Sequence, residues 1–66
     1  MEMIRVSSDA IAAIGYDAET MRMRVRFTSG STYSFCGVPA HMYDSFMRSM
    51  SKGSYYNSHI RGRYQC

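Results

Sequence analysis

Hydrophobic and polar side chains alternate strictly in one stretch of the chain. Residues 21–27 read Met-Arg-Met-Arg-Val-Arg-Phe, so that every second side chain is apolar and the others are arginines. A β-strand has this period of two, whereas a helix does not. The strand would turn its apolar side chains to one face and its cationic side chains, Arg22, Arg24 and Arg26, to the other. The pattern therefore predicts a strand with one buried and one solvated face.

The segments on both sides of this strand predict an antiparallel meander. Residues 28–31 form a turn-rich stretch, and residues 32–36 read as a second strand in which Tyr33 and Phe35 continue the apolar face as core residues. Upstream, residues 17–20 are a polar connection that follows a strand containing Ile14-Gly15-Tyr16. The three strands together occupy residues 12–36.

The first residues of the chain add two smaller expectations. Ile4-Arg5-Val6 has the composition of an edge strand. Ser7-Ser8-Asp9 follows, and these residue types often cap helices, so we expect a short helical turn that runs through Ala13.

After Pro39 the period changes to that of a helix. Proline is favoured in the first turn, where its missing N–H is not needed. Met42, Phe46 and Met50 recur every four residues, and Gly53 is expected to end this first helix.

Ser54 is expected to cap a second, shorter helix that places Tyr56 and Ile60 on its inner face and ends at Gly62. Strands first and helices after define the α+β class. The sequence thus predicts a small antiparallel meander of three to four strands followed by two helices packed on one face, in a single domain that spans residues 1–66.

Composition agrees with one small domain. The chain has 66 residues, of which 45% are hydrophobic and 20% charged, a balance that excludes a disordered tail and a collagen-like repeat. A chain of this length is also too short for a multi-domain enzyme or a deep enclosed cavity.

The positive charge is concentrated in the last third of the chain. Residues 1–44 hold five acids and four arginines, a net charge of −1, whereas residues 45–66 hold four cations and no acid, a net charge of +4. A basic half indicates phosphate, nucleic acid or an acidic protein surface as partner. The alternative is a solvated face whose charge keeps the protein soluble.

Cys36 and Cys66 are too few for a disulfide framework, so we expect reduced thiols in a cytoplasmic protein. The cysteines and histidines do not fall at the paired spacing of a metal site, and neither a metal nor another cofactor is expected. No segment approaches the ~20 apolar residues of a membrane span, so no membrane partner is expected.

Residues 51–63 combine a glycine-containing turn, polar side chains and cations at the start of the second helix. The free N–H groups and the dipole of a helix start favour an anion. Asn57 and Arg61 are expected to share one helix face, and Tyr43, Tyr55 and Tyr64 are expected to offer exposed rings for stacking on bases. The predicted nucleic-acid contacts are Lys52, Ser54, Tyr55, Asn57, Arg61 and Arg63.

The arginine strand is a second candidate surface. Alternate residues of a strand lie about 6.7 Å apart, so Arg22, Arg24 and Arg26 form a row that can follow an extended nucleic-acid backbone. The alternative is that they are simply the polar side of a half-covered sheet. Catalysis is not expected, because no serine–histidine–acid set is evident; Tyr55, His59 and Arg61 are the only imitation of a nucleolytic trio.

The chain resembles the KTSC domain family over nearly its whole length. The matching segments are Val25-Arg26-Phe27, Gly30, Tyr33-Ser34-Phe35, Val38-Pro39, Ser51-Lys52-Gly53-Ser54-Tyr55-Tyr56-Asn57 and Ile60-Arg61. Phe35 departs from the central Tyr-x-Tyr of the family and lacks a hydroxyl. The resemblance implies a small domain of the kind found at the C-terminus of some lysyl-tRNA synthetases and as single-domain bacterial and phage proteins, for which RNA binding is suggested and no catalytic residue is assigned.

The sequence therefore favours a non-catalytic domain that binds nucleic acid, RNA rather than DNA, through its basic C-terminal helical segment. The alternative is a protein–protein interaction module, such as a phage-encoded adaptor or inhibitor, that binds an acidic protein surface. A homodimer is compatible with either function.

Overall fold

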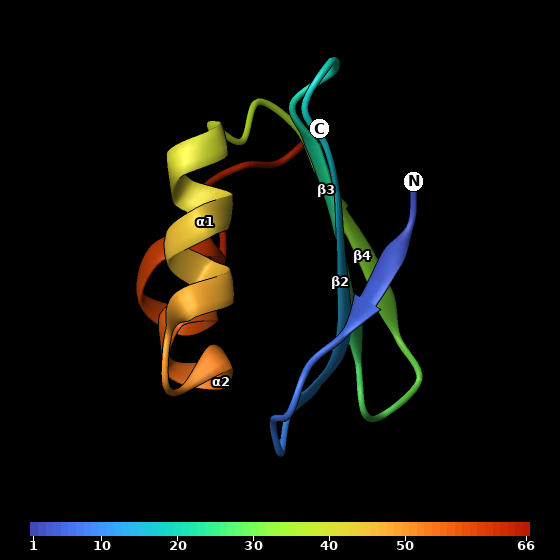
Figure 1. Ribbon diagram of the computed structural model, residues 1–66, viewed down its shortest axis with the longest axis vertical. Helices are drawn as coiled ribbons and strands as arrows, with labels where there is room; N and C mark the ends of the chain where they lie inside the picture. The colour runs from blue at the N-terminus through green and yellow to red at the C-terminus, as the bar shows by residue number, and fades with distance from the viewer.

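Four strands form one antiparallel sheet in which each strand pairs with the next one along the chain (Figure 1). They are β1 (Met3–Arg5), β2 (Ile11–Asp17), β3 (Arg22–Phe27) and β4 (Thr32–Phe35). The helices α1 (Ala40–Arg48) and α2 (Lys52–Tyr55) follow, and a π-helix, η1 (Tyr56–Ile60), continues directly from α2. This computed structural model describes residues 1–66. The predicted α+β meander, including the edge strand, is confirmed.

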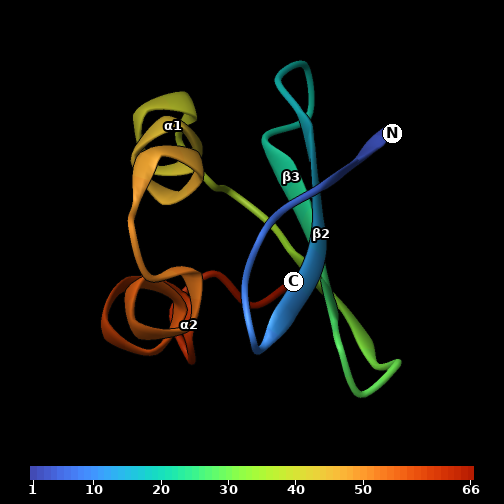
Figure 2. The same cartoon turned by 60° about the horizontal axis from the view of Figure 1, so that its bottom comes forward.

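All the helices lie on the same side of the sheet (Figure 2). The inner face of the sheet is set by the register, which pairs Ile14 with Val25 and Met23 with both Tyr16 and Phe35. Phe46 of α1 and Ile60 of η1 are fully buried against this face. The buried cluster comprises Ile11, Ile14, Met23, Val25, Phe35, Val38, Phe46 and Ile60.

The alternation in β3 produces the two faces that it predicts. Met23 and Val25 are fully buried, whereas Arg22, Arg24 and Arg26 are exposed on the opposite side. Met21 is an exception, because it lies in the connection before β3 with a φ of 58° and is 41% exposed. The strand therefore begins one residue later than the sequence pattern does.

The helical turn expected after Asp9 is wrong. Ser8 does cap a turn, since its Oγ accepts hydrogen bonds from the backbone N–H groups of Ala10 and Ile11, but the chain then enters β2. A register irregularity between Ile11 and Ala13 places Ile11 and Ile14, which are three residues apart, on the same buried face of the strand. This spacing departs from the period of two and conceals the strand in the sequence.

The first helix is shorter than expected. It ends at Arg48, because the backbone N–H and the side-chain hydroxyl of Ser49 both donate hydrogen bonds to the carbonyl oxygen of Phe46. Met50 lies beyond the helix and is fully exposed, so it is not a core residue. Pro39 precedes the first helical residue, as expected. No helix is long and apolar enough to cross a membrane.

The boundary of the second helix also differs. Gly53 lies inside α2 instead of ending α1, and Ser51, not Ser54, is the capping residue, with its Oγ accepting from the backbone N–H of Ser54. Gly62 follows η1 with a φ of 74°, a value that favours glycine and ends the helical segment as expected.

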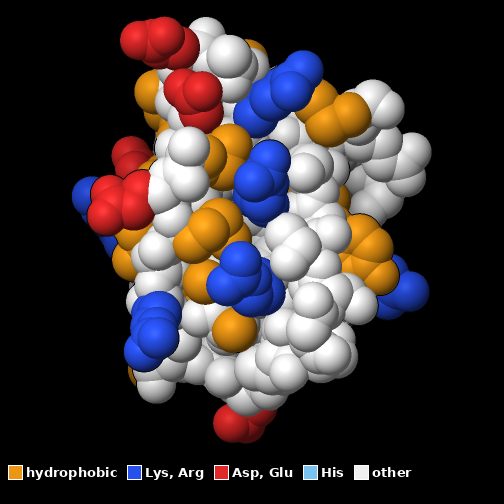
Figure 3. Space-filling model, turned by 90° about the vertical axis from the view of Figure 1, so that its right-hand side faces the viewer, with side chains coloured by type: hydrophobic (Ala, Val, Ile, Leu, Met, Phe, Trp, Pro, Cys, Tyr) orange, Lys and Arg blue, Asp and Glu red, His pale blue; other side chains and the backbone are white.

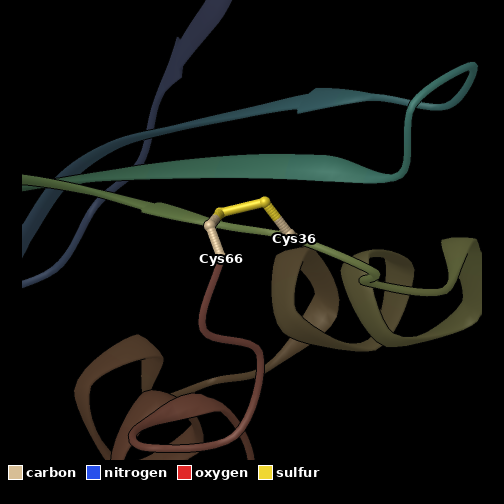
Figure 4. Close-up of a disulfide and its surroundings, with 2 residues drawn as sticks. All are labelled: Cys36 and Cys66. Carbon is tan, nitrogen blue, oxygen red and sulfur yellow. A yellow bond between two sulfur atoms is a disulfide. The ribbon is translucent and has the colours of Figure 1, made fainter.

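The expectation of reduced thiols is wrong in this structure. Cys36, directly after β4, forms a disulfide with Cys66 at the end of the chain (Figure 4). The backbone N–H of Cys36 also donates a hydrogen bond to the carbonyl oxygen of Tyr64, at 2.8 Å. The C-terminal segment thus returns to the sheet, a contact that two isolated cysteines in a sequence do not reveal.

Replacing both cysteines, Cys36→Ser with Cys66→Ser, is expected to lower the free energy of unfolding by about 3 to 4 kcal/mol. The disulfide closes a loop over a sequence separation of 30 residues and so restricts the unfolded chain. Urea unfolding measures the difference. The wild-type protein in excess dithiothreitol is the control and should match the double variant; equal stability of the oxidised wild type and the variant would contradict the prediction.

Candidate nucleic-acid interface

The face of the sheet turned away from the helices is uncovered, and a row of Lys or Arg side chains crosses it (Figure 3). The register explains why these side chains stand free. Arg24 is paired with Gly15 and Ser34, and Arg26 with Ala13 and Thr32, so that each arginine has a small residue on both sides. With these small register partners both arginines are exposed, and the Met3 side chain lies over Gly15 on the same face.

The edge strand β1 adds a fourth arginine, which the sequence did not predict to lie on this face. Arg5 is paired with Ala13, and Ala13 is paired with Arg26, so Arg5 lies on the same face. Only the pairing of β1 with β2 reveals this position. Asp17, paired with Arg22, adds a carboxylate at one end of the row. We call Arg5, Arg22, Arg24 and Arg26 the arginine face.

The six residues expected to bind nucleic acid in the C-terminal segment do not all line one cavity. Lys52, Ser54 and Asn57 line one cavity, and Arg61 lines another. Asn57 and Arg61 were expected to share a helix face, but residues 56–60 form a π-helix whose turn is wider than that of an α-helix. Arg63 is exposed in the segment that follows.

The cavity with Lys52 is a polar cleft of about 570 Å³ between the turn before β2 and the start of α2. Two of its serines have structural tasks, because Ser8 and Ser51 accept the capping hydrogen bonds of the two segments. Lys52 donates through Nζ to the carbonyl oxygen of Ser49 at 2.6 Å, just after the end of α1. The helix α2 has four residues, and the Ser54 N–H at its start is already bonded to the Ser51 Oγ.

Tyr55 is half-buried and its ring is engaged inside the protein. It stacks on Phe46 with ring centroids 5.5 Å apart and lies 4.5 Å from the ring of His59. Its hydroxyl contacts the sulfur of Met42 at 3.0 Å. The expected exposed stacking surface at Tyr55 is therefore not present.

Tyr43 and Tyr64 are likewise half-buried and pack against the core. The ring of Tyr43 stacks on Tyr16, with centroids 4.6 Å apart. The expectation that these two tyrosines offer exposed rings is also wrong.

The second cavity gathers aromatic residues around Arg61. It measures about 540 Å³ and opens between the β3–β4 hairpin and η1. Phe27 lies edge-to-face with Tyr33 and with Tyr56, with ring centroids 5.6 Å and 5.0 Å apart. The exposed ring at this site is Tyr33, which the sequence pattern assigns to the core but which is 53% exposed. Tyr33 belongs to β4, an edge strand that has a neighbour on one side only, and this position explains the exposure.

Burial raises the pKa of two tyrosine phenols. For Tyr56 desolvation is the largest cause; the positive charge of Arg61 opposes the shift, and Tyr33 adds to it. For Tyr43 desolvation is again the largest cause, and the carboxylate of Asp44 adds to it. Arg61 and Tyr33 line the same cavity as Tyr56.

Residues 7–64 match the KTSC domain, so the chain belongs to the KTSC domain family. A crystal structure of a KTSC domain protein from Yersinia pestis is similar in fold, with a TM-score of 0.95 and 34% identity over 98% of this chain and 92% of that one. The match confirms the family resemblance and the meander with its helices.

Two kinds of relative are similar in sequence. A small protein from Tsukamurella paurometabola is 35% identical over 60 residues, which cover 91% of this chain and 90% of that protein. A lysine–tRNA ligase from Nostoc punctiforme is 25% identical over 63 residues, or 96% of this chain, and the match spans 11% of the ligase. The domain thus resembles both stand-alone proteins and a short part of a much larger enzyme.

Tyr55→Ala is expected to lower the free energy of unfolding by about 2 kcal/mol, because it removes a ring stacked on the core residue Phe46. Tyr55→Phe keeps the ring, loses only the contact with the Met42 sulfur and should cost less than about 1 kcal/mol. Chemical unfolding of the two variants measures both values. An alanine variant as stable as the wild type would show that Tyr55 is not a packing residue.

Stability is expected to fall as the pH rises above about 10. The unfolded tyrosines ionise near pH 10.0, whereas Tyr43 and Tyr56 retain their protons to higher pH when folded, so alkaline solution favours the unfolded chain. Urea unfolding between pH 9 and about pH 11 measures the slope. The variant Tyr43→Phe/Tyr56→Phe should flatten it, and an unchanged slope in that variant would refute the assignment.

Proposed function

We propose that this KTSC domain binds single-stranded RNA through its arginine face and catalyses no reaction. The observation that supports the proposal is the uncovered sheet face, on which the four residues of the arginine face lie together and on which Arg24 and Arg26 have small residues as register partners. Three of them alternate along β3 at a spacing of about 6.7 Å, which suits successive phosphates of an extended strand. Arginine forks bind phosphate oxygens in pairs, which adds geometry to charge.

RNA is favoured as the nucleic acid because lysine–tRNA ligases contain a segment similar to this chain. A domain joined to an enzyme that is named for a tRNA substrate would serve by holding RNA. The proposal is non-enzymatic, since a face of arginines and small side chains can bind phosphates but offers no nucleophile–base pair.

The C-terminal cations are the second surface in this proposal. Sequence reasoning placed the main contacts there, at Lys52, Arg61 and Arg63, but Lys52 is bonded to the end of α1 and Arg61 lines a separate cavity. The arginine face, in contrast, presents its cations together on one regular surface. The ranking of the two surfaces is therefore reversed relative to the sequence analysis.

The double variant Arg24→Gln/Arg26→Gln tests the proposal against a control with the same change in net charge, Arg48→Glu, at an exposed position outside both surfaces. Affinity for a single-stranded RNA oligonucleotide is measured by fluorescence anisotropy at several salt concentrations. Loss of two phosphate contacts should reduce the salt slope by about 1.4, whereas the control should retain a slope close to that of the wild type.

An equal loss in the double variant and in the control would mean that net charge, and not the arginine face, governs binding. Wild-type affinity that is independent of salt would also contradict the proposal. Tight, salt-resistant association with a protein, together with no RNA binding, would establish the interaction-module alternative instead.

A further inference from the structure

The cavity around Arg61 has the composition of a binding site for a planar anion-bearing group. We call it the aromatic pocket; it is lined by Ala10, Phe27, Thr28, Ser29, Ser31, Tyr33, Tyr56 and Arg61. Aromatic rings provide flat apolar contact, and Arg61 is the one cation among these residues. Its volume of about 540 Å³ is in the range of small-molecule sites.

The stability of the fold does not account for the exposed part of this pocket. The core ends at Phe35 and Ile60, whereas Tyr33 extends past it with 53% of its surface exposed. The polar cleft offers a contrast, because the hydroxyls of Ser8 and Ser51 there are occupied as capping groups. A large exposed ring beside an arginine is a common feature of base-stacking sites.

The groups of the pocket are also close enough to act together. Arg61, Tyr33 and Tyr56 all line the same cavity, so their side chains lie in one neighbourhood. Phe27 supports the rings of Tyr33 and Tyr56 from between them, edge-to-face with each. The rings are therefore held in place before any ligand binds, which lowers the entropy cost of binding.

The pocket continues the arginine face around the edge of the sheet. β4 is an edge strand, and its Thr32 and Ser34 are paired with Arg26 and Arg24 on the outer face. Tyr33 stands between them in the sequence, and its side chain belongs to the opposite face, next to the pocket. A flexible strand bound along the arginine face would reach the pocket by turning over β4.

We propose that the aromatic pocket receives one unpaired nucleotide of the bound RNA, with its base stacked on Tyr33 and its phosphate bound by Arg61. This role rests on the proposed RNA binding and adds to it a site that contacts a base as well as the backbone. Stacking tolerates every base, so the pocket would select an unpaired nucleotide over a paired one and would show little sequence preference.

Adenosine 5′-monophosphate tests the pocket without the arginine face. Nuclear magnetic resonance titration should show saturable shifts at the amides of Phe27, Tyr33, Tyr56 and Arg61. Tyr33→Leu removes the π-face at an exposed position and should weaken binding about 5- to 150-fold. Tyr33→Phe is the matched control and should bind as the wild type does. Ribose 5-phosphate, which lacks the base, should bind at least as weakly as the nucleotide binds to Tyr33→Leu.

An RNA oligonucleotide with one abasic position separates this inference from the proposed function. The expected result is that Tyr33→Leu lowers the affinity of the intact RNA and that the abasic RNA binds both proteins equally. If RNA binds with the predicted salt slope but neither Tyr33→Leu nor the abasic position changes its affinity, the pocket inference is overturned and the RNA-binding proposal stands.

Two other outcomes complete the test. Saturable binding of the nucleotide in the pocket without any binding of oligonucleotides would support the pocket and refute the RNA-binding proposal. Shifts that lie outside the pocket, or that are unchanged in Tyr33→Leu, would overturn the inference. Displacement of the nucleotide by an acidic peptide at lower concentration would show that the pocket is a protein site.

Discussion

Burial of one face of the sheet under Phe46 and Ile60 is the interaction on which the rest of this structure depends. The two side chains come from α1 and η1, and both are fully buried against Met23, Val25 and their neighbours. A chain of 66 residues has only enough helix to cover one side of a four-stranded sheet. The other side must therefore meet solvent, and the strict alternation of β3 fills it with arginines. The arginine face is thus a consequence of the same packing that forms the core.

The C-terminal third is shaped by the need to bring Ile60 back to that core. The π-helix continues α2 for one wide turn, which buries Ile60 while Tyr56 lines the aromatic pocket. Such turns are rare and occur frequently at functional sites. Beyond Gly62 the chain returns to the end of β4, where the disulfide between Cys36 and Cys66 and the backbone contact of Tyr64 hold it. The helical part of the chain contributes only Phe46 and Ile60 to the buried cluster. It is joined to the sheet at its start by the chain that follows β4 and at its end by the disulfide.

Sequence patterns reveal the sheet better than they reveal the ends of the helices or the sites. The alternation of apolar residues and arginines around Val25 was enough to predict β3, its hairpin with β4 and the exposure of the arginines. The end of α1 escaped prediction because it depends on the Ser49 hydroxyl competing for one carbonyl group, and the strand at Ile11 was concealed by its irregular register. The disulfide and the fourth arginine, Arg5, depend on contacts between distant segments, which periodicity does not encode. Tyr55 was predicted to be exposed but packs on Phe46, because an aromatic residue next to cations in the sequence can equally well pack inward.

The small size of the domain also determines what kind of partner its surfaces suit. A thin layer of helix over a sheet cannot enclose a ligand, so recognition must occur on a face and at an edge. Three residues of the arginine face repeat along β3, whereas the aromatic pocket lies beyond β4 on the other side of the sheet. A rigid duplex can contact the first surface but cannot bend over a strand edge to reach the second. A single strand of RNA can do both, because its backbone turns freely and its unpaired bases are available for stacking. Within the proposed RNA binding, the arrangement of the two surfaces around β4 therefore favours an unpaired segment over a duplex.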